Sequence, residues 1–323
     1  MNNYSFLEQL LHKIVLSSKF LKEMSFDLEK SYFLKYCDDY PDNHVFITGL
    51  ARSGTTILLN SIHQTGIFGS LSYDDMPFIL SPNLWSKING NGFQKESIER
   101  AHGDGIIIST NSPEAFEEVF WMTFKSDNED SLEQFFEYVK LILYKKGKVR
   151  YLSKNNQNVK RIDLIKRGFP NSKILIPFRD PLQHSYSLLV QHKRFTEKQE
   201  KDEFIRSYMK WIGHSEFGID YEPIMNKEIK YNNFNELNHW LEQWLFLYQK
   251  LSYYKTDNKV LFICYEDLCE IDLVWDSIQS FIGINDKKDF EFIKSTKEIR
   301  LPYNKDLYNE CLTTYQRLKN YFD

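Results

Sequence analysis

The stretch "HVFITGLARSGTTILLNSI", residues 44–62, indicates the fold of the chain. An apolar, β-rich run ends at Gly49, a short loop follows, and apolar residues then recur at helical spacing. Strand, glycine loop and helix in this order are the setting in which a phosphate-binding loop works. The pattern Gly49-x-x-x-x-Gly54-Thr55-Thr56 matches such a loop, except that Thr55 stands where nucleoside triphosphatases carry a lysine.

The loop has the properties of a local anion site. Backbone N–H groups at the start of a helix form an anion-binding nest, and the helix dipole reinforces it. Glycines let the chain approach the anion closely, and the two threonines add hydroxyl groups. The missing lysine argues against ATP or GTP, because that lysine bridges their last two phosphates. A tight structural connection without a ligand is the alternative interpretation. The candidate binding residues are Arg52, Ser53, Gly54, Thr55 and Thr56.

Two further apolar runs have the length of buried strands. The run "SKILIPFRDP" at 172–181 follows a helical segment, and "KVLFICYEDL" occupies 259–268. Strands that alternate with helices predict an α/β fold with a mainly parallel sheet flanked by helices. Together with the loop, this pattern is typical of folds like that of P-loop nucleoside triphosphate hydrolases. Ligands then bind at the carboxyl ends of the strands.

The rest of the chain suggests a single domain over residues 1–323. Residues 1–40 have the helical spacing of an amphipathic segment. Charged and aromatic helical stretches such as "FNELNHWLEQWLFLYQKL" predict that residues 196–256 form a helical insertion or cap over the ligand edge. The N-terminus lacks the features of a signal peptide, and no apolar stretch approaches the roughly 20 residues of a membrane span. We therefore expect a cytoplasmic protein.

Composition excludes several classes of partner. Lysine and arginine total 41 against 45 aspartates and glutamates, so the net charge of −4 gives no general attraction to nucleic acid. Four scattered cysteines suggest neither a disulfide scaffold nor a metal site. Any anion site must therefore be local, and the oligomeric state stays open.

A second basic element follows the strand in "ILIPFRDPLQHSYSLLVQHKRF". The strand ends at Arg179, and Ser187 follows eight residues later on the predicted helix. Arg179 offers a guanidinium, and Ser187 a hydroxyl, to a second anion. The alternative is that Arg179 simply pairs with Asp180.

The two elements in combination resemble sulfotransferases that use 3'-phosphoadenosine 5'-phosphosulfate (PAPS). The resemblance implies that the loop binds the 5'-phosphosulfate and that Arg179 and Ser187 hold the 3'-phosphate. "YEDL" at 265–268 and "YLSKNNQNVKRIDLIKRGFP", which brings in Lys154, are similar to further family segments. An arginine before "SGTT" points to the bacterial and protein-tyrosine branches. PAPS has no γ-phosphate, so a loop that binds it does not need the lysine that contacts that group.

The resemblance also implies a reaction. The sulfuryl group moves in line from PAPS to a hydroxyl acceptor, and adenosine 3',5'-bisphosphate is released. Arg52 and Lys154 are expected to stabilise the charge that grows on the leaving oxygen, without a required metal. Arg300 corresponds to a late basic contact to the nucleotide in relatives, and a plain surface arginine is its alternative. The acceptor class, whether protein tyrosine, sugar, lipid or small metabolite, is not specified.

A hydroxyl acceptor needs a general base. In "SLSYDDMPFILSPNLW", Asp75, with Asp74 as its alternative, stands where tyrosine-sulfating relatives place a catalytic glutamate. Both aspartates are equally compatible with a solvated turn before Pro77. Other possible bases are His63, His102 and His214.

Two other functions stay open. A P-loop kinase or nucleotide hydrolase would need a replacement lysine and an acidic magnesium ligand, for which Asp180 is a candidate. A non-catalytic nucleotide-binding scaffold would keep the phosphate cradle without turnover.

Overall fold

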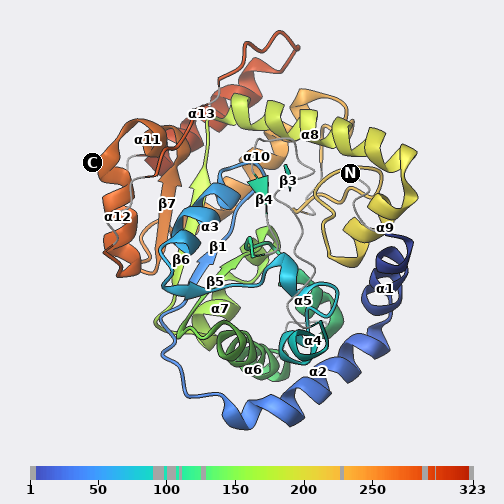
Figure 1. Cartoon of the computed structure of the whole chain (residues 1–323). Coiled ribbons are helices and arrows are strands. Elements are labelled where there is room, and N and C mark those ends of the chain that lie inside the picture. Colours follow the sequence, from blue (N-terminus) through green and yellow to red (C-terminus); the bar gives the residue numbers. More distant parts are fainter. Residues whose placement is uncertain are drawn as a thin grey trace.

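A computed structural model describes residues 5–89, 98–99, 107–108, 111–124, 129–225, 229–285, 290–294 and 296–319. Its centre is a five-stranded parallel sheet flanked by helices (Figure 1). The strands in spatial order are β2 (Phe68–Gly69), β5 (Arg150–Lys154), β1 (Val45–Ile47), β6 (Lys173–Phe178) and β7 (Val260–Cys264). A short antiparallel pair, β3 (Ile98–Glu99) and β4 (Ile107–Ile108), lies apart from this sheet. The predicted α/β fold class is confirmed.

The strand order puts a switch point at β1. From β1 the chain builds β2 and β5 on one side, and then crosses to build β6 and β7 on the other. In open α/β sheets, ligands bind at the carboxyl ends of strands where the order reverses in this way. Ile47, the last residue of β1, pairs in register with Lys154 of β5 and Leu175 of β6. The loop after Ile47 therefore lies at the expected ligand crevice.

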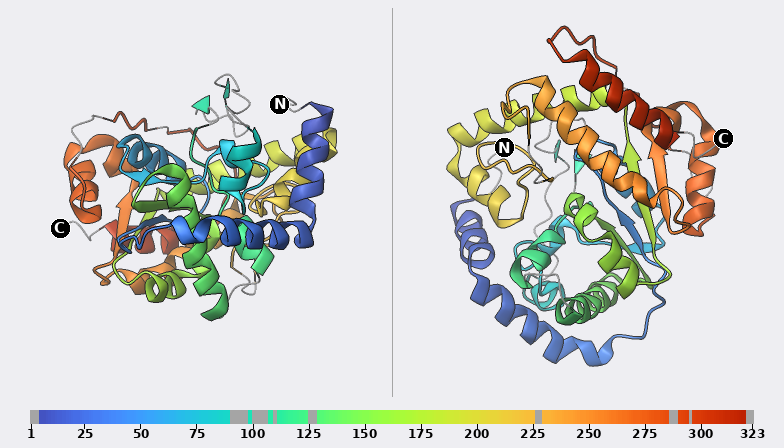
Figure 2. Two further views of the ribbon diagram at one scale, coloured as in Figure 1. Left: turned by 60° about the horizontal axis from the view of Figure 1, so that its bottom comes forward. Right: turned by 180° about the vertical axis from the view of Figure 1, so that it is seen from behind.

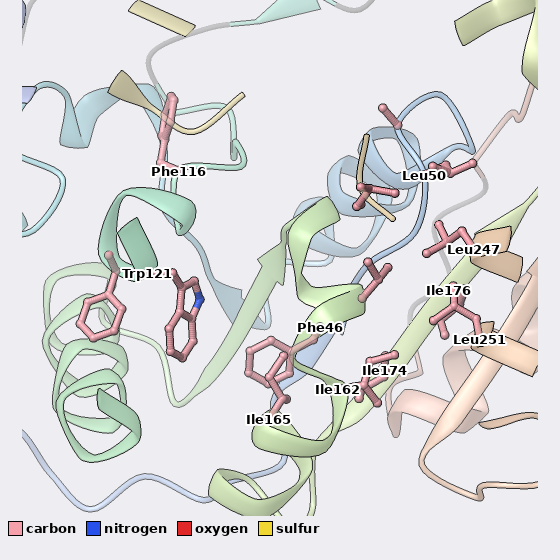
Figure 3. Packing of buried hydrophobic residues seen from close by; sticks show 14 of the residues in the cluster. Phe46, Leu50, Phe116, Trp121, Ile162, Ile165, Ile174, Ile176, Leu247 and Leu251 are labelled. Carbon is pink, nitrogen blue, oxygen red and sulfur yellow. The ribbon is translucent and has the colours of Figure 1, made fainter. Parts of the chain in front are cut away.

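Both faces of the sheet are buried, which explains the continuous apolar runs. Alternate residues point to opposite faces, so Val45 and Ile47 enter one core and Phe46 the other. Phe46 lies beside Ile162 and Ile165 in the core (Figure 3). The first face is covered by α3 (Thr55–Gln64), α11 (Tyr265–Glu270) and α12 (Asp272–Ile282). The second is covered by α6 (Glu129–Lys146), α7 (Ile162–Gly168), α10 (Leu237–Leu251) and α13 (Lys305–Lys319).

The N-terminal residues form a helical arm, α1 (Phe6–Ser17), α2 (Lys19–Phe33) and the 3-10 turn η1 (Leu34–Tyr36). Ser18 separates the two helices, and its hydroxyl caps α2 by accepting the Leu21 N–H. The arm runs along one side of the molecule and turns at α1 toward α9 (Glu203–Trp211) (Figure 2). Along the way, α2 packs on α6, α4 (Pro82–Asn89) and α5 (Glu118–Phe124).

Residues 196–256, expected as an insertion or cap, lie in two different parts of the structure. Its first part continues α8 (Pro181–Lys201) into α9, beside the N-terminal arm. Its last part, α10, lies on a face of the sheet, where the Tyr248 hydroxyl donates to the Pro177 carbonyl at 2.9 Å. Helix α10 is buried nearly all round, as expected of a helix without a polar side. Residues 237–251 therefore belong to the core rather than to a cover over the strand ends. None of the described helices is long and apolar enough to span a membrane.

Candidate active site

The loop after β1 has backbone angles and close contacts that require glycine at two positions. Gly54 precedes α3 at a φ of 105°, and a Cβ on it would lie 2.6 Å from a ring carbon of Tyr265. Gly49 has a φ of 146°, and its Cβ would lie 3.2 Å from the Pro177 carbonyl oxygen. Arg52 adopts a φ of 69°, which costs a residue with a side chain about 1–3 kcal/mol. Such stored strain is typical of ligand-binding loops.

The structure brings the two predicted anion elements together. The Arg52 Nε–H donates to the Ser187 hydroxyl of α8 at 3.3 Å, and Arg179 Nη1 donates to the Arg52 carbonyl at 3.3 Å. The Arg179 guanidinium also lies 5.1 Å from the ring centre of Tyr265. Residues 135 positions apart thus form one basic cluster at the end of β1 and β6.

Asp180 is the N-cap of α8. Its carboxylate caps α8 by accepting the N–H groups of Leu182 and Gln183 at 3.0 and 2.9 Å. The acidic group near Arg179 is instead Glu266, whose Oε1 lies 3.9 Å from Arg179 Nε. The described contacts of Arg179 therefore favour a place in the loop cluster over a simple pairing with Asp180.

Two side chains brace the loop from inside. The Ser53 hydroxyl is buried and donates to the Leu50 carbonyl at 2.8 Å, so it holds the turn. His184 of α8 is buried, and its Nε2 donates to the Ala51 carbonyl at 2.8 Å, since a carbonyl only accepts. Burial, outweighing the hydrogen bond to Ala51, lowers the pKa of His184 to about 3, and nearby Arg179 and Arg52 act in the same direction. His184 is therefore a neutral support of the loop near pH 7.

Lys154 ends β5 beside the start of the loop. The Asn155 N–H donates to the Ile47 carbonyl at 3.0 Å, and the Thr48 hydroxyl donates to the Asn155 carbonyl at 2.9 Å. Lys154 itself is only 7% exposed. The predicted lysine and the predicted loop therefore share one edge of the sheet.

Two adjacent glutamates hold the chain on both sides of Lys154. Glu117 accepts hydrogen bonds from Ser153 and from Asn158, the latter at 2.8 Å. Glu118 accepts one from Asn155 at 2.8 Å and two from Arg161 at 2.7 and 2.8 Å. Sequence reasoning missed both, because "EEVFWMTF" reads simply as acids at the start of an aromatic helix. Both glutamates position the lysine segment.

The aspartates predicted as bases lie in different surroundings. Asp75 has no exposed surface, and its carboxylate lies 2.6 Å from Lys145 Nζ and 2.9 Å from Lys146 Nζ. Asp74 also contacts Lys145, at 3.2 Å. Both lysines end α6 just before β5 begins, whereas the loop follows the end of β1. These contacts give Asp75 a structural role and do not suit a base that must reach an acceptor.

The contacts of Asp75 lead to a stability prediction. Burial raises the pKa of Asp75, but Lys146 and Lys145 outweigh it and hold the pKa below the usual 3.8. Because the folded pKa is depressed, this stabilisation is present above the unfolded pKa and is lost as pH falls through the folded value. We expect Asp75→Asn to lower the free energy of unfolding at pH 7 by about 3 kcal/mol, because the buried carboxylate loses its charge and the part-buried Lys145 and Lys146 lose their shared partner, although Lys145 keeps Asp74.

Urea unfolding of Asp75→Asn at pH 7 and pH 3 checks this prediction. The difference from the wild type should shrink at the lower pH. Asp39→Asn is the control, because Asp39 also pairs with a lysine, at 2.6 Å, but its side chain is 98% exposed. Equal effects of the two substitutions would contradict the role assigned to Asp75.

The remaining sequence candidates differ in their surroundings. His63 is on the last turn of α3, at the opposite end from the loop, and burial lowers its pKa, as do the charges of Lys146 and Lys148. His214 is half-buried, and its Nε2 lies 3.3 Å from the Ala115 carbonyl. The Arg300 guanidinium is 82% exposed and pairs with Glu298 at 2.9 Å. His102 lies outside the described residues.

The comparison with known families agrees with this arrangement. The sequence profile of a sulfotransferase family matches residues 44–214, just over half of the 323 residues. The chain belongs to the sulfotransferase family. The matched span begins just before the phosphate loop and includes Lys154, Arg179, Ser187 and His214.

The fold is that of a solved sulfotransferase. Sulfotransferase STF1 from Mycobacterium tuberculosis H37Rv aligns with a TM-score of 0.50 and 11% identity, over 98% of this chain and 86% of that one. Sulfotransferase STF9 from Mycobacterium avium aligns with a TM-score of 0.49 and 10% identity, over 97% and 78% of the two chains. At such identities the likeness concerns the fold alone. No match was found among curated proteins.

Proposed function

We propose that this sulfotransferase moves the sulfuryl group of PAPS to a hydroxyl acceptor and releases adenosine 3',5'-bisphosphate. The observation that supports this proposal most is the cluster of Arg52, Arg179 and Ser187 at the end of the phosphate loop. PAPS carries two separate anionic groups, and the cluster joins two separate anion-binding elements. A nucleotide with a phosphate at only one position would leave one of these elements without a partner.

The residues divide between the two anionic groups. The N–H groups at the start of α3, with the hydroxyls of Thr55 and Thr56, face the 5'-phosphosulfate, and Gly54 lets it approach. Arg179 and Ser187 bind the 3'-phosphate. Arg52 bridges the two elements. Ser53 contributes through its brace on the loop.

Arg300 is a proposed late contact to the nucleotide. Its segment is fixed to the start of α8, because the Gln183 side chain exchanges two hydrogen bonds with the backbone of Lys297, both at 2.9 Å.

A magnesium-dependent kinase or hydrolase is less consistent with these contacts. The loop carries Thr55 instead of the lysine, and the one acid offered as a magnesium ligand, Asp180, is used as a helix cap.

Calorimetric titration tests the proposal. Adenosine 3',5'-bisphosphate, 5'-AMP and ATP with magnesium are compared on the full chain. Preference for the bisphosphate supports a PAPS site and justifies a screen of acceptors with labelled PAPS. Preference for ATP with magnesium contradicts it in favour of a kinase, while bisphosphate binding without transfer to any acceptor class favours a scaffold.

Lys154 is proposed to stabilise the leaving oxygen during transfer. Because charge grows there only in the transition state, Lys154→Met should lower turnover about a hundredfold. Affinity for adenosine 3',5'-bisphosphate should change far less. Single-turnover assays with labelled PAPS and an active acceptor, beside calorimetry, measure the two effects. A loss of affinity as large as the loss of rate would assign Lys154 to ground-state binding instead.

His214 is proposed as the general base in place of the aspartates. Its Nε2 donates to the Ala115 carbonyl, which leaves Nδ1 as the unprotonated nitrogen. Nearby, Glu216 accepts a hydrogen bond from Asn156, two residues after Lys154, at 3.0 Å. His214→Ala should lower turnover about a hundredfold in single-turnover assays and leave the affinity for adenosine 3',5'-bisphosphate unchanged. Unchanged turnover would exclude His214 as the base.

A further inference from the structure

The carboxylate of Glu266 connects the ends of two neighbouring strands beside the basic cluster. Glu266 lies at the start of α11, directly after β7, and Arg179 directly follows β6. The last residues of these strands, Phe178 and Cys264, pair in register. Glu266 Oε1 accepts the Asp180 N–H at 3.1 Å, whereas its distance of 3.9 Å from Arg179 Nε is too long for a hydrogen bond. The firm contact of Glu266 is therefore with the backbone that follows Arg179.

This hydrogen bond fixes the turn that carries both residues assigned to the 3'-phosphate. Asp180 is the N-cap of α8, so its N–H marks the point at which the helix leaves the strand. Arg179 precedes this cap, and Ser187 lies on the same helix. The position of both side chains relative to the loop after β1 depends on the direction of α8 at its start. Glu266 holds that start from the neighbouring strand.

Glu266 is itself oriented by α13. The Tyr315 hydroxyl, 49 residues further along the chain, donates to Glu266 Oε2 at 3.3 Å, and the Cys264 thiol donates to the same oxygen at 3.5 Å. Tyr315 is buried, and its ring packs edge-on against Phe178, with 5.6 Å between the ring centres. Helix α13 packs on both β7 and α8 (Figure 1). Each carboxylate oxygen thus has its own partner, so rotation of the group would break contacts on both sides.

We propose that Glu266 is a positioning residue for the 3'-phosphate site and that Tyr315 fixes its orientation. Glu266 acts through its hydrogen bond to Asp180 rather than through its charge, because a carboxylate beside a phosphate repels it. Its role belongs to the acceptor oxygen, which glutamine also has. This inference rests on the proposed function, since it takes Arg179 and Ser187 as the residues that bind the 3'-phosphate.

Calorimetry of Glu266→Gln and Glu266→Ala with adenosine 3',5'-bisphosphate and 5'-AMP tests the proposal. Both substitutions remove the negative charge. Glutamine can still accept the Asp180 N–H and direct its NH2 group at the Tyr315 hydroxyl, which accepts as well as donates. The affinity of Glu266→Ala for the bisphosphate should be about tenfold below that of Glu266→Gln, because one hydrogen bond is lost. The two variants should bind 5'-AMP equally well.

Tyr315→Phe tests the second part of the proposal. It removes one of the two donors to Glu266 Oε2 and should weaken bisphosphate binding about threefold, with 5'-AMP binding unchanged. Tyr254→Phe is its control, because Tyr254 also donates to a carboxylate, that of Asp163 at 2.9 Å. Unchanged bisphosphate binding by Tyr315→Phe would remove Tyr315 from the proposal.

Asp257→Ala is the matched control for Glu266→Ala. Asp257 stands before the opposite end of β7, and its carboxylate likewise accepts a backbone N–H, that of Lys259 at 2.9 Å. Its side chain is 19% exposed, against 13% for Glu266. Asp257→Ala should leave both nucleotide affinities unchanged.

Hydrogen exchange of the unliganded protein gives an independent measurement. Mass spectrometry of the peptide that contains Asp180 should show faster exchange in Glu266→Ala than in Glu266→Gln, because the alanine variant leaves the Asp180 N–H without its acceptor. Equal exchange would contradict the hydrogen bond as the cause.

The outcomes separate this inference from the proposed function. If the wild type prefers the bisphosphate to 5'-AMP, but the two Glu266 variants bind the bisphosphate equally, the inference is overturned and the proposed function stands. A wild type without that preference contradicts the proposed function, and the inference falls with it. Equal losses for both nucleotides in Glu266→Ala would assign Glu266 to the general stability of the fold instead.

Discussion

Replacement of Arg179 by alanine is expected to weaken the binding of adenosine 3',5'-bisphosphate about a thousandfold. The guanidinium is held beside the Arg52 carbonyl, the Tyr265 ring and the Glu266 carboxylate, so its direction is fixed before a ligand arrives. Two charged hydrogen bonds to a phosphate contribute about 2 kcal/mol each, and each 1.4 kcal/mol is tenfold in affinity. Affinity for 5'-AMP should fall much less, because that nucleotide lacks the 3'-phosphate.

Calorimetry with both nucleotides measures this difference. Arg206→Ala is the matched control, because Arg206 is a half-exposed arginine on α9 that pairs with Asp220 at 2.6 Å. It should leave both affinities unchanged. Arg179→Lys should recover only part of the loss, since an ammonium cannot reproduce the planar fork of a guanidinium. An equal loss for the two nucleotides in Arg179→Ala would contradict its assignment to the 3'-phosphate.

Gly54→Ala is expected to reduce nucleotide binding by a similar factor for a different reason. The new methyl group would stand 2.6 Å from a carbon of the Tyr265 ring, and the backbone φ of 105° is unfavourable for alanine. Overpacking and backbone strain cost about 1–3 kcal/mol each, so the loop must move to relieve them. Because the loop supplies the N–H groups for the anion, binding should fall about a thousandfold.

Gly66→Ala is the control that separates backbone strain from the clash with a neighbouring side chain. Gly66 also has a positive φ, of 75°, but nothing lies within 4 Å of the position of its Cβ. It lies beyond the far end of α3, and its substitution should lower stability slightly and leave nucleotide binding intact. Thermal unfolding and calorimetry of both variants measure stability and binding independently. Full binding by Gly54→Ala would show that the loop does not contact the ligand.

The fold was predictable because its central signals are local. "HVFITGL" and "SKILIPF" are apolar on both faces, as strands buried between two helical layers must be. Strand β5 was harder, since "RYLSK" ends in polar residues that are buried in the structure. Ser153 can be buried because its hydroxyl donates a hydrogen bond to Glu117, which lies 36 residues earlier in the chain. A pairing at that distance leaves no periodic trace in the sequence.

The candidate site was predictable in the parts that a motif specifies. Arg52, Arg179 and Ser187 were identified individually, and the fold brings them together. The surroundings of Asp75 could not be predicted, because its lysine partners lie 70 and 71 positions further on and meet it only in the tertiary structure. Helix α10 was expected over the strand ends because its aromatic residues do not reveal in the sequence which other elements they pack against. Its burial on nearly all sides follows from three neighbours: α8, α13 and the sheet, which it meets at Pro177.

The long sequence separation within the Arg52–Ser187 contact has a consequence for biosynthesis. The loop leaves the ribosome early, but the Ser187 hydroxyl that contacts Arg52 follows 135 residues later. Asn155, which contacts Thr48 at the start of the loop, follows 107 residues after it. Contacts between such distant residues form late in folding. A nascent chain that ends before α8 therefore has the motif without the site. Retention on an immobilised bisphosphate would then distinguish completely folded chains from truncated ones.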